Sequence, residues 1–218
     1  MNNTRNKTTL HEAIYTLRAM RRLKTDPIPL EDLRYVVDAA TMACSPGNSQ
    51  TWRFLVITDT EQKRKIGEIY RRVGLKAIKE GALASGLLDE AAEKVYRNAM
   101  ILVDHLQDAP ALIMCCMPAI TEKTNSEKNS INQSTHYGAI YPAIQNLMLA
   151  ARAKGLGTTM TTLHKADESA VKDVLQIPDD IETVALIPLG YPEGKWGKPL
   201  RRPSQEVTYW NRWGEQAE

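Results

Sequence analysis

The sequence predicts a single domain of mixed helices and strands, in either the α+β or the α/β class. Segments with helical periodicity interleave with about four short apolar runs, which is the pattern of a layered domain. No internal repeat divides the 218 residues, and the one polar stretch that could mark a boundary, residues 121–134, is too short to link two domains. A chain of this length buries roughly 70% of its unfolded surface, so it can form a core without disulfides or metals. We therefore expect residues 1–218 to fold as one unit.

The first half of the chain begins with two helices that are separated by prolines. Thr9 and Glu12 have the spacing of a capping box, and the helix that they open runs into arginines at 18, 21 and 22. Pro27 and Pro29 end that helix. The later elements expected up to residue 106 are a helix with its apolar face at Leu33, Val36, Val37 and Ala40, a turn at 45–48, a strand at 54–58, a charged helix from 59 to about 79, and a weakly amphipathic helical stretch over 81–106.

The second half contains the clearest strand and the clearest helix. Residues 109–117 form a continuous apolar run bounded by prolines, which predicts a buried strand. Ile140, Ile144 and Leu147 recur at helical spacing, and Gly155 with Gly157 ends that helix. The other expected elements are a polar loop at 121–134, a threonine-rich strand at 158–163, a short helix at 166–175, a strand at 183–189, and a tail from 193 without helical period.

The composition excludes several classes of protein. Lys and Arg number 28 against 26 Asp and Glu, so the net charge of +2 argues against a nucleic-acid partner or an anionic membrane surface. No apolar run approaches the roughly 20 residues of a membrane span. The cysteines at 44, 115 and 116 have neither a disulfide pattern nor metal-ligand spacing, which favours a reducing compartment. Residues 1–9 are polar and lack the apolar core of a signal peptide, so we expect a cytoplasmic protein.

Local motifs do not predict hydrolase, metal or nucleotide-loop chemistry. Gly155 and Gly157 lack the third glycine of a dinucleotide fingerprint and follow a helix instead of a strand. The four histidines are not paired at metal-ligand spacing, and Ser45 lacks the flanking residues of a nucleophile elbow. What remains is a set of arginines near turns, and arginine forks bind phosphate. The simpler interpretation, a solvated basic helix end, suits the same pattern.

Four segments, in the right order along the chain, resemble the motifs of the nitroreductase family. Together they extend over nearly the whole sequence, which makes the resemblance much more specific than any one piece. They are LRAMRRLKTDPIP at 17–29, ACSPGNSQTWRF at 43–54, YPAIQNLMLAARAKGLG at 141–157, and IPLGYP at 187–192 followed by RRP at 201–203.

This resemblance implies an α+β fold of three layers, α-β-α, around a central and mostly antiparallel sheet. It also implies a tight homodimer with FMN at each subunit interface. The arginines would meet the ribityl phosphate and the edge of the ring, the 45–50 turn would reach the flavin from the other subunit, and the 161–163 segment would lie beside N5, largely through backbone groups. The cofactor-binding residues implied in this way are Arg18, Ala19, Met20, Arg21, Arg22, Ser45, Pro46, Asn48, Gln50, Thr161, Thr162, Leu163, Arg201 and Arg202. Gln145 and Tyr141 are further candidates.

The implied activity is ping-pong electron transfer from NADH or NADPH, through flavin N5, to a small acceptor such as a nitroaromatic or a quinone. The flavin carries that chemistry, so no catalytic side chain and no metal are expected. The alternatives are a specialised reductase of the same family, such as a dehalogenase or an enone reductase, and a non-catalytic flavin store or sensor. Residues 74–106 take the place of a variable lid, and dimer packing is the equal alternative. The tryptophan-rich tail, 195–218, is expected to pack on the partner subunit. Ala19 stands where the family often has serine, and Cys44 where it usually has proline.

Overall fold

A four-stranded sheet forms the centre of the molecule. The computed structural model describes residues 8–85, 90–120 and 130–216. The strand order is β1-β2-β4-β3, and each neighbouring pair is antiparallel. The strands are β1 (Arg53–Ile57), β2 (Ala111–Pro118), β3 (Gly157–Thr158) and β4 (Ile181–Gly190). The α-helices are α1 (Leu10–Thr16), α2 (Leu30–Thr41), α3 (Thr60–Ser85), α4 (Glu90–His105), α5 (Ser130–Ala153) and α6 (Glu168–Leu175).

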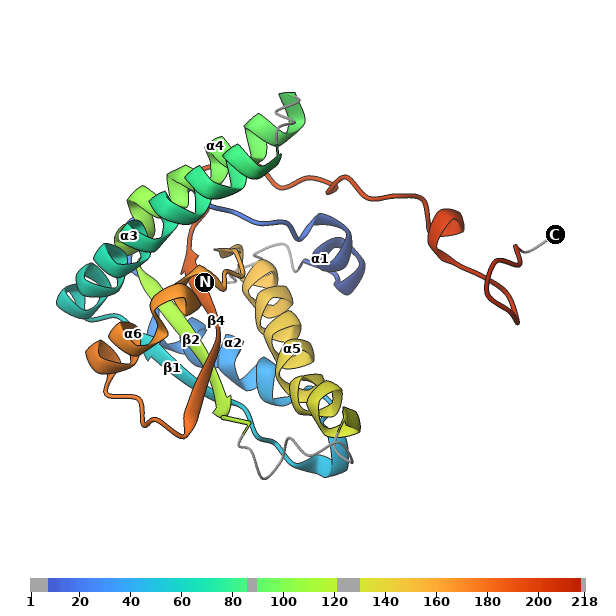
Figure 1. Ribbon diagram of the computed structural model, residues 1–218, viewed down its shortest axis with the longest axis horizontal. Coiled ribbons are helices and arrows are strands. Elements are labelled where there is room, and N and C mark those ends of the chain that lie inside the picture. The colour runs from blue at the N-terminus through green and yellow to red at the C-terminus, as the bar shows by residue number, and fades with distance from the viewer. Residues whose placement is uncertain (1–7, 86–89, 121–129, 217–218) are drawn as a thin grey trace, which may run out of the picture.

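Helices cover both faces of this sheet (Figure 1), which confirms the expected α-β-α layers. The alternation of side chains along β2 separates the two cores. Ile113 and Cys115 belong to the cluster formed with α2 and α5, whereas Leu112 and Met114 belong to the cluster formed with α3, α4 and α6. Because both faces are covered, β2 is apolar along its length, as the continuous apolar run predicted.

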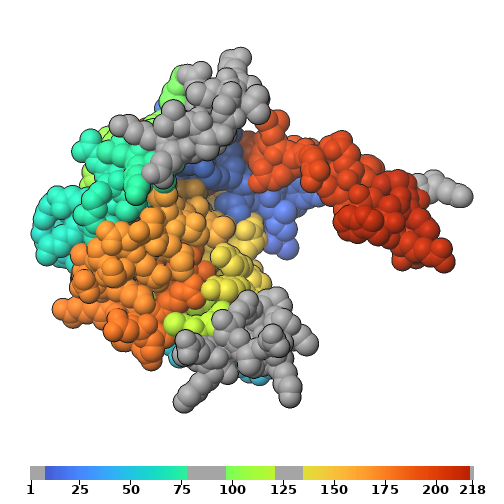
Figure 2. All heavy atoms as spheres, viewed as in Figure 1, coloured from blue at the N-terminus to red at the C-terminus, as the bar shows by residue number. Residues whose placement is uncertain are grey.

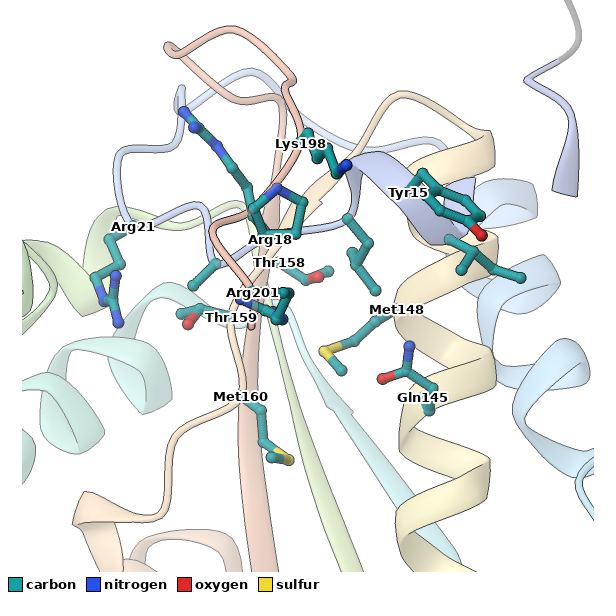
Figure 3. Close-up of a pocket in the computed structure, with 14 residues that line it drawn as sticks. Tyr15, Arg18, Arg21, Gln145, Met148, Thr158, Thr159, Met160, Lys198 and Arg201 are labelled. Carbon is teal, nitrogen blue, oxygen red and sulfur yellow. The ribbon is translucent and has the colours of Figure 1, made fainter. Parts of the chain in front are cut away.

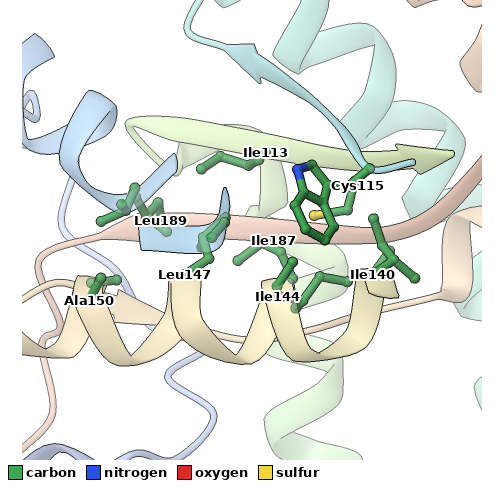
Figure 4. Packing of buried hydrophobic residues seen from close by; sticks show 14 of the residues in the cluster. Ile113, Cys115, Ile140, Ile144, Leu147, Ala150, Ile187 and Leu189 are labelled. Atoms are coloured by element: carbon green, nitrogen blue, oxygen red, sulfur yellow. The ribbon is translucent and has the colours of Figure 1, made fainter. Parts of the chain in front are cut away.

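The central helix α5 packs its apolar stripe on the sheet (Figure 4). Ile140, Ile144 and Leu147 are fully buried, which confirms the face predicted from their spacing. Each such side chain contributes about 1.5–3 kcal/mol by leaving water. The helix ends near Gly155, whose φ of 75° is in the left-handed region that glycine adopts without strain.

Three predicted elements differ in the structure. The first helix ends at Thr16, so residues 18–22 are extended instead of helical, because the Met20 N–H pairs with the Thr158 carbonyl at 2.8 Å. The strand predicted at 158–163 is confined to its first residue and one bridge, Thr161 to Leu186, and a 3-10 turn begins at Leu163. Residues 130–134 of the predicted loop belong to α5. Residues 121–129 of that loop lie outside the described residues, as do Leu87 and Leu88 of the predicted lid.

The C-terminal segment stands clear of the body (Figures 1 and 2). Between residues 195 and 216 its one regular element is a 3-10 turn at Ser204–Val207, in accordance with the missing helical period. Leu200 is 97% exposed and Trp213 is 89% exposed. In the described ranges, no helix is long and apolar enough to cross a membrane.

Candidate cofactor site

A cavity of about 570 Å³ opens where α1, α5, the 158–160 segment and the base of the C-terminal arm meet. Its size is in the range of small-molecule and cofactor sites. In Figure 3, Gln145 and Met148 point into it from α5. The lining residues are Ile14, Tyr15, Leu17, Arg18, Ala19, Arg21, Gln145, Met148, Thr158, Thr159, Met160, Lys198, Pro199 and Arg201.

Four cationic side chains line this cavity: Arg18, Arg21, Lys198 and Arg201. None of the four forms an ion pair with any residue in the described part of the chain, and the one side-chain hydrogen bond among them there runs from Arg201 to the carbonyl of Leu200. Like charges without counterions repel one another, so the site is suited to an anion that accepts several charge-assisted hydrogen bonds. Sequence reasoning missed Lys198, although its place three residues before Arg201 was a usable signal.

The arginine segment is held against the sheet by a close approach at Gly157. An ideal Cβ atom built on Gly157 would lie 2.9 Å from the Cβ atom of Met20, closer than side chains tolerate. Met20 itself is 5% exposed, so it anchors the segment in the core while Ala19 and Arg21 line the cavity. The second glycine of the Gly155–Gly157 pair therefore permits backbone contact, and the contact positions the cations.

Arg152 of α5 links this helix to α1 and to the base of the C-terminal arm, which form two other walls of the cavity. It is 4% exposed; its Nε donates to the Thr16 hydroxyl at 3.0 Å and its Nη2 to the Glu12 carboxylate at 2.8 Å. Its guanidinium lies 4.2 Å from the centre of the Trp196 ring, at the base of the arm. One buried cation thus joins α1, α5 and the arm, which are all part of the cavity wall. The Thr9 cap expected for α1 is confirmed, since its hydroxyl accepts from the Glu12 N–H.

A second cavity of about 320 Å³ adjoins the first and shares Arg21, Thr159 and Met160 with it. The predicted residues Thr161, Thr162 and Leu163 line this second cavity. The Thr161 N–H donates to the Leu186 carbonyl at 3.0 Å, and the Thr161 carbonyl accepts from the Leu186 N–H at 2.8 Å. The Thr161 N–H is therefore occupied, and its side-chain hydroxyl is the donor that Thr161 has left, whereas backbone contact by Thr162 stays a prediction.

The other predicted site residues lie outside the main cavity of the single chain. The side chain of Met20 is in the core, Arg22 faces a separate groove beside His105 and Asp108, and Arg202 is exposed. Pro46 lies near Gly138 of α5, about 10–15 Å along that helix from Gln145 and Met148 at 1.5 Å per residue. Ser45, Asn48 and Gln50 share its exposed turn, which the Ser45 hydroxyl closes by accepting from the Gln50 N–H at 2.9 Å.

His164 follows the cavity-lining Leu163 and lies in a buried polar network. Its Nε2 is 3.1 Å from the Thr183 hydroxyl, and Thr183 donates its N–H and O–H to one oxygen of Glu168. Burial lowers the pKa of His164 to about 4, so this imidazole is neutral near pH 7. Across the described ranges, no group of three or more His, Cys, Asp or Glu side chains is arranged to hold a metal ion.

Comparison with known proteins places this geometry in a family. The model described as "Nitroreductase family" matches residues 14–191. The chain is 28% identical over 175 residues to a 5,6-dimethylbenzimidazole synthase of Rhodospirillum rubrum, covering 80% of this chain and 78% of that one. It is 28% identical to an NADH dehydrogenase of Thermus thermophilus, covering 88% and 91%, and 28% identical to an iodotyrosine deiodinase of Thermotoga neapolitana, covering 91% and 95%.

Solved structures share the same fold. A structure of oxidised iodotyrosine deiodinase bound to FMN and 3-iodo-L-tyrosine aligns with a TM-score of 0.70 at 24% identity, covering 89% of this chain and 96% of that one. A BluB-like flavoprotein of Clostridium difficile aligns with a TM-score of 0.71 at 20% identity, covering 94% and 99%. At these identities the structures support the fold, and the ligands belong to the proteins that hold them.

Proposed function

The chain belongs to the nitroreductase family, and from this premise we propose that it is an FMN-dependent oxidoreductase that transfers electrons from NADH or NADPH to a small acceptor. The cofactor, the nicotinamide donor and the ping-pong order are the specific parts of this proposal. Flavin binding at the main cavity is the step on which the other two depend.

The observation that carries the proposal is the cluster of cations without counterions in the main cavity. Arg18, Lys198 and Arg201 offer the charge-assisted donors that a phosphate dianion requires. The Thr158 hydroxyl, which lines the same cavity, is buried and has no hydrogen-bond partner in the described part of the chain. A buried polar atom of this kind is costly to leave unpaired, and a bound ligand would satisfy it. The donor set therefore fits FMN.

In this proposal the residues divide the work between the two ends of the cofactor. Arg18, Lys198 and Arg201 hold the phosphate, while Arg21, which lines both cavities, places a permanent positive charge beside the ring. When bound, FMN supplies the atom that accepts and returns a hydride. The Arg21 cation favours the negative charge that develops on reduction, and it does so without a proton-transfer step.

A specialised reductase of the same family is the second candidate. It is favoured by the relatives, because an iodotyrosine deiodinase matches 91% of this chain and a 5,6-dimethylbenzimidazole synthase matches 80%. Reduction of a halophenol, and not of a nitroaromatic or a quinone, would distinguish a reductive dehalogenase from a general reductase. A flavin store or sensor would hold FMN without rapid reduction by either nicotinamide.

We propose a homodimer in which the exposed arm covers the partner subunit. Trp210 is 55% exposed and Trp213 is 89% exposed, so the arm leaves large aromatic surface in water in the single chain. The turn with Ser45, Pro46 and Asn48 lies away from the cavity of its own chain, and a partner subunit would allow it to contribute there. The free cysteines are consistent with the reducing cytoplasmic compartment that we propose.

Flavin binding provides the first test. The purified protein should be yellow, or should become so with added FMN. Arg18→Ala or Arg201→Ala should weaken FMN binding by roughly 10- to 150-fold, the equivalent of about 1.5–3 kcal/mol for a lost charged hydrogen bond. Arg71→Ala is the matched control, since Arg71 is exposed and pairs with Asp104 on the surface. An absence of flavin absorbance, or equal flavin loss in all three variants, contradicts the proposal.

Electron transfer provides the second test. NADH and NADPH are mixed anaerobically with the flavin-loaded protein, and nitroaromatic, quinone and halophenol acceptors follow. Rapid bleaching of the flavin by one nicotinamide and recovery with an acceptor are expected. Bleaching that takes hours with both nicotinamides would favour a store or sensor.

A further inference from the structure

A buried phenol contacts the threonine hydroxyl that lines the second cavity. Tyr70 lies on α3 and is 3% exposed, and its hydroxyl oxygen is 2.8 Å from the hydroxyl oxygen of Thr161, 91 residues further along the chain. Its ring belongs to the core cluster formed with α3, α4 and α6, so the phenol cannot rotate away without disturbing that core. The contact is therefore a fixed feature of the cavity wall.

The Thr161 oxygen has a second partner. The Leu163 N–H donates to it at 3.3 Å. A hydroxyl group has two acceptor lone pairs and one hydrogen. If Tyr70 also donates, both lone pairs of Thr161 are occupied, and its hydrogen is left for a ligand in the cavity.

Chemistry favours Tyr70 as the donor of this pair. A phenol is a stronger acid than an aliphatic alcohol, so it is the better donor when the two meet. Arg21 lines the same cavity as Tyr70, and its positive charge polarises the O–H further. Burial raises the pKa of Tyr70, so the phenol keeps its hydrogen at neutral pH.

From these contacts we infer that Tyr70 is a positioning residue, which fixes the Thr161 hydroxyl as a hydrogen-bond donor to the ligand in the cavity. The Thr161 backbone is committed to Leu186, so the hydroxyl is the donor that Thr161 has left. A Thr161 hydroxyl that can only donate favours a ligand atom that accepts a hydrogen bond over one that carries a hydrogen.

The consequence for a flavin rests on the proposed function. The N5 atom accepts a hydrogen bond in the oxidised ring and carries a hydrogen in the reduced ring. A Thr161 hydroxyl locked as a donor therefore favours the oxidised ring. In Tyr70→Phe, a lone pair of Thr161 becomes free to accept, so the reduced ring gains stability and the midpoint potential shifts to more positive values.

The test compares Tyr70→Phe, Thr161→Val and the double variant in the full-length, FMN-loaded protein. We expect both single variants to shift the flavin midpoint potential in the positive direction, and the double variant to shift no further than Thr161→Val. The binding of FMN should change by less than about threefold in Tyr70→Phe. Tyr137→Phe is the matched control, because it removes a phenol that donates to Glu182 on a different part of the sheet, and it should leave the potential unchanged.

A purely structural role for Tyr70 would lower the melting temperature without moving the potential, and that outcome overturns the inference. Additive shifts in the double variant would do the same. If the wild-type protein binds no FMN, the proposed function fails on its own, and the inference is then judged by a cycle of unfolding free energies for the same three variants. Non-additive unfolding free energies support the coupling between Tyr70 and Thr161, whereas additive values refute it.

Discussion

Adding one methyl group at Gly157 should disturb both the core and the cofactor site. In Gly157→Ala, the new Cβ atom would lie 2.9 Å from Met20 Cβ, 3.1 Å from Leu23 Cδ2 and 3.2 Å from Pro192 Cβ. Carbon atoms in contact prefer about 3.5–4.0 Å. The Leu23 atom is at the flexible end of a side chain and can move, but the Met20 and Pro192 atoms are attached to or near the backbone. The segment that carries Arg18 and Arg21 must therefore shift.

The cost of this overlap follows from the packing. Overfilling a close-packed site costs about 1–3 kcal/mol. For a chain of this size each kcal/mol lowers the melting temperature by about 2–4 °C, so we expect a decrease of roughly 2–12 °C. The shift also strains the hydrogen bond from the Met20 N–H to the Thr158 carbonyl, which is 2.8 Å long. Arginines displaced in this way should bind FMN about tenfold more weakly, a loss of about 1.4 kcal/mol.

Thermal melting of the protein and fluorescence titration with FMN measure the two effects. Gly194→Ala is the control, because an ideal Cβ atom at Gly194 meets nothing within 4 Å and its φ is not in the left-handed region. The control should melt and bind like the wild type. If Gly157→Ala also matches the wild type in both measurements, the close approach at Gly157 does not position the arginines.

Three further predictions concern the anchor, the buried imidazole and the arm. Arg152→Ala should lower the free energy of unfolding in urea by about 1–3 kcal/mol. This is less than for a fully buried ion pair, because its partner Glu12 is half-exposed. A urea unfolding curve with unchanged midpoint and slope would contradict this prediction. Burial lowers the pKa of His164 to about 4 from 6.5, so the unfolded chain binds the extra proton first, and stability should fall by about 2 kcal/mol between pH 7 and pH 5. His164→Gln should flatten that profile, and an equally steep decline in the variant would assign it to other groups. Deleting residues 203–218 removes Trp210 and Trp213 and should convert the proposed dimer to a monomer by light scattering; a dimer mass that persists would show that the arm is not the main contact.

The periodic elements could be predicted from the sequence because their patterns are local. The apolar face of α5 and the continuous apolar run of β2 each lie within about 25 residues, where helical and strand spacing determine which side chains are buried. The arginine segment could not be predicted in this way. Periodicity continued the first helix through Arg18 and Arg21, but hydrogen bonding to Thr158 draws these residues into an extended path.

The candidate site was predicted only in part. The motif resemblance pointed to Arg18, Arg21 and Arg201, and these three line one cavity. Lys198 and Tyr70 were missed, since neither belongs to a motif. Lys198 lies three residues before Arg201, whereas Tyr70 reaches the site only through contacts with distant parts of the chain. The 45–50 turn lies away from the cavity of its own chain, so its part in the site stays a prediction that depends on a second subunit.

The sequence by itself determined the class of fold, the order of its main elements and the family, because hydrophobic periodicity and short motifs are properties of neighbouring residues. Only the tertiary structure decided which cations share a cavity, that Gly157 permits their approach, and that Tyr70 meets Thr161. Those contacts join residues as many as 91 positions apart. Their geometry depends on how the layers pack, and no local spacing in the chain encodes it.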